Sequence, residues 1–73
     1  MLIKIDKDTI INLDNILMIY KSPKTLAFVL EELEYDTEFK NEELCDKAEK
    51  AIIESYKRDV KFCDISKYSK KVE

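Results

Sequence analysis

The chain has 73 residues, of which 45% are hydrophobic and 40% are charged, and its formal net charge is −3 at pH 7. This length allows one domain, and the apolar content is high enough for a folded core. The sequence contains no glycine and no histidine, which excludes glycine-rich phosphate-binding loops and removes the commonest general base and metal ligand. We therefore expect no cofactor, no metal and no enzymatic activity.

Residues 2–5 are predicted to form the first strand, followed by a turn at residues 6–8. The charges in this segment interrupt the apolar run that a signal peptide requires, so we expect a cytoplasmic protein whose cysteines are reduced. The longest apolar run covers residues 16–20, whereas a membrane span needs about 20 residues. We expect no membrane association.

Residues 10–20 are rich in β-branched and aliphatic side chains, interrupted by Asp14 and Asn15. This pattern predicts a strand on each side of a turn. The sequence Lys-Ser-Pro-Lys at residues 21–24 predicts the next turn. Residues 25–31 have apolar side chains on both faces, which is typical of a central strand.

The clearest strand pattern covers residues 33–39, where every second residue is acidic. Because side chains alternate along a strand, we expect one face to be buried and the other to be exposed to solvent. The residues of the acidic face are Glu34, Asp36 and Glu38, and those of the core face are Leu33, Tyr35, Thr37 and Phe39.

Asn41 is a suitable N-cap for a helix from about 42 to 57. The helix is amphipathic. Its core-facing stripe is predicted to consist of Leu44, Cys45, Ala48, Ala51, Ile52, Ser55 and Tyr56. Three ion pairs are predicted at i,i+4 spacing, namely Glu43–Lys47, Asp46–Lys50 and Glu54–Arg58.

Residues 60–65 predict a short edge strand, and the polar, lysine-rich residues 66–73 predict a tail. The domain is therefore expected to cover residues 1–65. The predicted fold class is α+β, a small curled antiparallel β-meander of four or five strands with one amphipathic helix packed on it.

Three segments of the chain combine an Asn-Leu-Asp-Asn turn with a hairpin and a terminal helix, at residues 12–20, 25–31 and 42–58. This layout resembles that of small bacterial proteins such as the flagellar accessory proteins. The sequence departs from them because it lacks the glycine expected in the hairpin turn. The resemblance implies a structural or accessory protein, and an unpaired strand edge would let such a small domain form a homo-oligomer.

The charges are distributed unevenly, since residues 31–49 contain nine acids and two lysines. One interpretation is a solvated face that protects a strand edge and keeps the protein soluble. The other is a surface that binds a basic partner, because acids on one strand face are spaced by about 7 Å, close to the phosphates of a nucleic acid. The candidate partner-binding residues are Glu31, Glu34, Asp36, Glu38, Glu42, Glu43 and Asp46.

Our hypothesis is a non-catalytic protein-binding module, an inhibitor or adaptor for a partner with a basic surface. Phage inhibitors of bacterial defence that imitate nucleic acid belong to this class. The homo-oligomer is the alternative, and the negative net charge argues against direct nucleic-acid binding. A thiol-dependent enzyme is a further alternative, but Cys45 and Cys63 lie in apolar patterns and are predicted to be buried.

Overall fold

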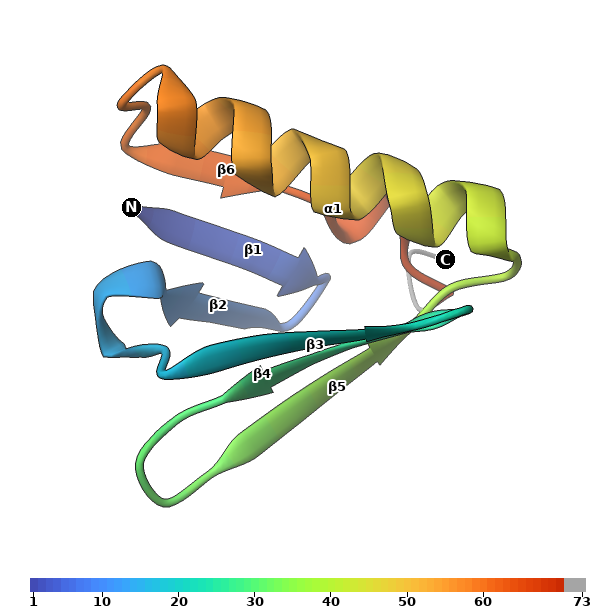
Figure 1. The fold of residues 1–73 in the computed structure, drawn as a ribbon, viewed down its shortest axis with the longest axis horizontal. Coiled ribbons are helices and arrows are strands. Elements are labelled where there is room, and N and C mark those ends of the chain that lie inside the picture. The colour runs from blue at the N-terminus through green and yellow to red at the C-terminus, as the bar shows by residue number, and fades with distance from the viewer. Residues whose placement is uncertain (71–73) are drawn as a thin grey trace.

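The computed structural model describes residues 1–70 and has an α-helix and two small sheets (Figure 1). The strands of this region are β1 (Leu2–Asp6), β2 (Thr9–Asn12), β3 (Met18–Ser22), β4 (Thr25–Val29), β5 (Glu34–Glu38) and β6 (Phe62–Asp64), and the helix is α1 (Glu42–Lys57). Two short 3-10 helices, η1 (Leu13–Asn15) and η2 (Ser66–Tyr68), follow β2 and β6. The predicted α+β class is confirmed.

The strands form two sheets with the orders β2-β1-β6 and β3-β4-β5. In the second sheet β4 is antiparallel to both neighbours, but in the first β1 is antiparallel to β2 and parallel to β6. The predicted single antiparallel meander is therefore wrong. The parallel pair forms because α1 carries the chain back to the end of the molecule where β1 starts, so that β1 and β6 run in the same direction (Figure 1).

Helix α1 has the predicted bounds. The side chain of Asn41 accepts a hydrogen bond of 2.9 Å from the backbone N–H of Leu44, which satisfies one of the unpaired donors of the first turn. Of the predicted core-facing stripe, Cys45, Ala48 and Ile52 are buried, while Tyr56 is 70% exposed. The helix is too short and too polar to span a bilayer, and the described chain has no other candidate.

The core lies between the inner faces of the two sheets and α1. Its largest fully buried side chains are Phe28, Phe39, Ile3, Ile5, Leu26, Ile65 and Cys45. Strand β4 is central in its sheet, as predicted, and Leu26 and Phe28 on its inner face are completely inaccessible. Burial of side chains of this size is the dominant stabilising contribution in so small a domain.

Strand β5 has the predicted alternation, but only its C-terminal half reaches the core. Thr37 and Phe39 are 3% and 1% exposed, whereas Leu33 and Tyr35 are 58% and 37% exposed. The prediction that all four residues form a core face is therefore wrong for the first two. The reason is geometric, since β5 begins away from α1 and the β2-β1-β6 sheet and approaches α1 only toward its C-terminal end (Figure 1).

The C-terminal segment is folded further than the sequence predicted. The expected edge strand is present as β6, and beyond it Ser66 and Ser69 are buried, within or beside η2. Ser69 forms a β-bridge with Phe39, and the backbone N–H of Lys70 donates a 2.9 Å hydrogen bond to the carbonyl of Glu38. Residues 66–70 therefore belong to the domain, and the rest of the predicted tail lies outside the described residues.

Replacing Phe39 by alanine is expected to lower the free energy of unfolding by about 3 to 5 kcal/mol, because it leaves a cavity in the core. The matched control is Leu33→Ala, directly before β5 as Phe39 is directly after it, but 58% exposed, which should cost about 0.5 kcal/mol or less. Urea denaturation followed by circular dichroism measures both values. Equal losses for the two variants would contradict the assignment of the core to one end of β5.

Asp64 is expected to stabilise the end of β6 in a pH-dependent way. The backbone N–H of Ser66 donates a 2.9 Å hydrogen bond to its carboxylate, and the Ser66 hydroxyl donates a second, which together lower the pKa of Asp64. A lowered pKa in the folded state contributes stability that is present above the unfolded value of about 3.9 and is lost as the pH falls through the folded value. Denaturation of Asp64→Asn should thus show lower stability than wild type at neutral pH and convergence in acid. A difference that persists at the lowest pH would exclude this mechanism.

Candidate protein-binding surface

Three of the predicted site residues form a row on the outer face of β5. In the register of the sheet, Glu34 pairs with Val29, Asp36 with Ala27 and Glu38 with Thr25. All three acidic side chains are exposed, while the intervening Thr37 faces the core. The alternation that the sequence predicted for the acidic face is therefore confirmed.

Glu34 and Asp36 are close enough to interact directly. A hydrogen bond that protonated Glu34 can donate to Asp36, together with the repulsion between the two charges when both are ionised, raises the pKa of Glu34. Within residues 1–70, neither carboxylate forms an ion pair with a lysine or arginine. The pair thus combines two like charges at a solvent-exposed position without a compensating cation.

Glu38 differs from the other two residues of the row. Its carboxylate lies 3.0 Å from the amino group of Lys70, in the segment that covers the end of β5. The sequence pattern predicts a tail at Lys70, so this contact was not predicted. Glu38 therefore has a structural role in holding the C-terminal segment on β5, although an exposed ion pair of this kind contributes at most about 1 kcal/mol.

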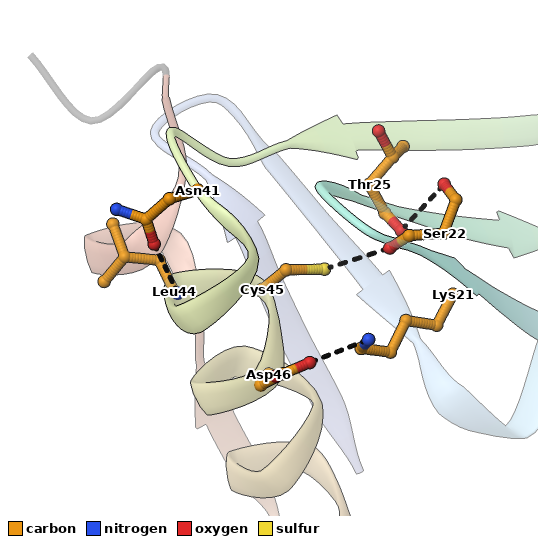
Figure 2. A network of polar contacts seen from close by, with 7 residues as sticks. All are labelled: Lys21, Ser22, Thr25, Asn41, Leu44, Cys45 and Asp46. Atoms are coloured by element: carbon orange, nitrogen blue, oxygen red, sulfur yellow. Dashed lines mark hydrogen bonds and ion pairs between the residues drawn. The ribbon is translucent and has the colours of Figure 1, made fainter.

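The acids at the start of α1 are also partly occupied by contacts within the chain. Asp46 lies 2.7 Å from the amino group of Lys21 on β3, as Figure 2 shows, so the predicted Asp46–Lys50 pair is replaced by a contact between two elements. Its hydrogen bond raises the pKa of Lys21. Glu43 forms the predicted pair with Lys47 at 3.7 Å. Glu42 is exposed in the first turn, where its negative charge interacts favourably with the helix dipole.

The seven predicted residues do not form one continuous surface. Glu31 lies in the turn between β4 and β5, and Glu42 lies at the start of α1, which is at the opposite end of β5 (Figure 1). The contact of Asp46 with β3 draws it toward another strand. Within residues 1–70, the predicted site residues that form no ion pair and lie together are Glu34 and Asp36, with Glu31 at the nearby turn.

Two exposed leucines lie beside this acidic region and were not identified as site residues from the sequence. Leu17 precedes β3 and is 70% exposed, and Leu33 precedes β5 and is 58% exposed. Both line a shallow depression at this end of the sheet. The position of Leu33 between Glu32 and Glu34 could have indicated an exposed residue, but the strand pattern assigned that residue to the core.

Neither cysteine is placed for chemistry. Cys45 is fully buried, and its thiol donates a 3.7 Å hydrogen bond to the carbonyl of Ser22 (Figure 2). Burial raises the pKa of Cys45, which opposes formation of the reactive thiolate. Cys63 is buried as well, and both are free thiols. In the described part of the chain, no three cysteine or carboxylate side chains gather in an arrangement that could hold a metal ion.

Comparison with known proteins adds no relative, since no protein-family model, no curated protein and no solved structure matches this chain.

Cys45 is expected to react slowly with a thiol reagent under native conditions, because it is buried and its pKa is raised. The matched control is Lys50→Cys, an exposed position on the same helix, which should react at the rate of a free peptide thiol. Mass spectrometry after timed labelling distinguishes the sites, and unfolding in guanidinium should expose both native cysteines. Fast labelling of Cys45 in the folded protein would favour a thiol-dependent enzyme.

Proposed function

We propose that this protein is a non-catalytic protein-binding module, an inhibitor or adaptor, that presents the acidic outer face of β5 to a partner with a basic surface. The observation that supports this most directly is the pair formed by Glu34 and Asp36. Their mutual interaction raises the pKa of Glu34, and no cation of residues 1–70 neutralises them. A lysine or arginine of a partner would remove this repulsion on binding.

The physical basis is electrostatic complementarity. Exposed charges at the edge of an interface act chiefly on the association rate and on the choice of partner. The row on β5 repeats at about 7 Å, because residues i and i+2 share one face of a strand. An acidic row with this spacing suits a partner whose basic surface binds nucleic acid, so inhibition by imitation of a nucleic acid is the narrower form of the proposal.

The three acids of the row differ in their contacts, and this difference decides which of them to replace. Glu38 contacts Lys70 in the C-terminal segment, so its replacement would remove an ion pair within the chain as well as change the surface. Glu34 and Asp36 form no such pair within residues 1–70. The variant E34K/D36K therefore reverses the charge of the proposed surface. It replaces one exposed pair of like charges by another, so it should fold with a stability close to that of wild type.

Binding to the partner should be lost in E34K/D36K and retained in the control variant D8K/E54K. The control makes the same change in net charge with exposed residues of other elements, namely Asp8 in the β1–β2 turn and Glu54 on α1. The three proteins serve as baits in extracts of the native cell, and the captured partner is then measured by surface plasmon resonance. We expect the association rate of wild type to fall by about tenfold or more between low salt and physiological salt, where the Debye length is about 8 Å.

The result that would overturn the proposal is equal affinity of wild type and E34K/D36K for the partner, with a native circular dichroism spectrum for both. Equal loss in E34K/D36K and D8K/E54K would indicate an effect of net charge alone. That result also contradicts a specific surface on β5.

The second candidate function is a structural or accessory homo-oligomer. Strand β3 is at the edge of its sheet, and β4 is its only strand partner in the described chain. An unpaired edge can accept a strand from another copy. This candidate predicts self-association in light scattering, weak dependence on salt and loss of assembly in Tyr20→Pro on β3, since proline cannot donate a ladder hydrogen bond.

A further inference from the structure

The end of the β3-β4-β5 sheet extends past the core. The last paired residues of the three strands at this end are Met18, Val29 and Glu34. The adjacent residue beyond each of them is a leucine, at positions 17, 30 and 33. The backbone N–H of Leu17 donates a 2.8 Å hydrogen bond to the carbonyl of Val29, and that of Leu30 donates a 2.7 Å bond to the carbonyl of Leu33. These bonds hold the ends of the three strands together. The β4–β5 turn projects away from α1 at the bottom of Figure 1.

The three leucines surround a shallow depression of about 610 Å³ at this end of the molecule. Its wall also carries three carboxylates, from Asp14 on η1 and from Glu31 and Glu32 in the β4–β5 turn. None of the lining residues is a lysine or an arginine. The depression therefore combines three leucines, here called the apolar floor, with three carboxylates of one charge sign, here called the rim.

The carboxylates of this rim are largely uncompensated. Asp14 lies 4.0 Å from the N-terminal amino group, and its side chain is 79% exposed. Within residues 1–70, no ion pair is formed by Glu31 or Glu32. The rim remains available to cations from outside the chain.

A single exposed leucine needs no explanation, because folded proteins expose much apolar surface. Here two highly exposed leucines share one depression with a third leucine and a charged rim. Protein interfaces have this anatomy, in which a few apolar residues at the centre supply most of the affinity and surrounding charges set the orientation and the choice of partner.

We propose that this depression binds a segment of a partner protein that carries one or two aliphatic side chains flanked by lysine or arginine. The aliphatic side chains contact Leu17, Leu30 and Leu33, and the cations contact Asp14, Glu31 and Glu32. This inference rests on the proposed function, since it identifies the chemistry of the basic partner that meets the acidic end of β5. Its basis is charge complementarity, because a rim of three carboxylates repels acidic segments.

A second copy of the chain is a less suitable occupant. A symmetric contact between two copies brings the same patch of each into opposition. The acids of one rim would then face the acids of the other, and like charges in opposition cost several kcal/mol. The charge of the rim therefore favours a different, basic protein.

The test uses the ¹⁵N-labelled full chain and three synthetic peptides of equal length. The first contains lysines and two leucines, the second contains the same lysines with serines in place of the leucines, and the third contains glutamates and the two leucines. We expect the lysine–leucine peptide to bind about tenfold more tightly than the lysine–serine peptide, because burial of one leucine is worth at least this factor. Its chemical-shift changes should centre on residues 14–17 and 30–34, and the glutamate–leucine peptide should not bind.

Two double variants distinguish binding by the leucines of the depression from nonspecific binding by exposed apolar side chains. L17S/L33S removes both exposed leucines of the depression, and I10S/Y56S removes two comparably exposed apolar side chains elsewhere, at 56% and 70% exposure. All four positions are exposed, so both variants should remain folded. We expect L17S/L33S to lower the affinity for the lysine–leucine peptide to that of the lysine–serine peptide, and I10S/Y56S to leave it unchanged.

The outcomes distinguish this inference from the proposed function. If both lysine peptides bind equally and E34K/D36K weakens both, the acidic face is supported and the apolar floor is excluded. If neither lysine peptide binds, the inference is contradicted. The proposal that the acidic surface alone can bind a basic segment is then contradicted as well. If light scattering finds a dimer of wild type that L17S/L33S converts to a monomer, the occupant is a second copy, and the inference is overturned.

Discussion

The structure depends on a core that is small in relation to the sheets around it and that includes Phe28 of β4 and Phe39, directly after β5. A chain of 73 residues buries a limited area, and the core is concentrated where α1 and the β2-β1-β6 sheet meet the β3-β4-β5 sheet. The opposite end of the β3-β4-β5 sheet lies away from α1 (Figure 1). Leu17 and Leu33 are exposed there for this reason, and the surface proposed to bind a partner is a direct result of the size of the core.

Two groups can be distinguished among the acidic residues between positions 31 and 49 once their contacts are known. One group stabilises the fold: Asp46 connects α1 to β3 through Lys21, Glu38 holds the C-terminal segment through Lys70, and Glu43 pairs with Lys47. The other group, near the start of β5, has no such partner within residues 1–70. This division focuses the functional hypothesis on one end of the domain. It also separates the charges that can be altered without loss of an ion pair within the described chain from those that cannot.

Local features were predictable because they depend on neighbours in the sequence. Helix α1 has the expected bounds, since its N-cap at Asn41 and the spacing of Cys45, Ala48 and Ile52 are properties of one segment. The alternation on β5 was predictable for the same reason. The extent of burial was not, because periodicity indicates which side chains share a face, and only the surrounding elements decide how much of that face is covered. Leu33 and Phe39 follow the same pattern and have opposite environments.

The sequence by itself determined the α+β class, the single helix, the outward direction of Glu34, Asp36 and Glu38, and the burial of both cysteines. Only the tertiary structure decided that β6 joins β1 in parallel, that Ser66 and Ser69 are buried, that Asp46 contacts Lys21, and that the leucines at positions 17, 30 and 33 meet beside an acidic rim. These features bring together residues that are far apart in the chain. Their pairing depends on how the sheets and the helix pack, and no pattern within one segment carries that information.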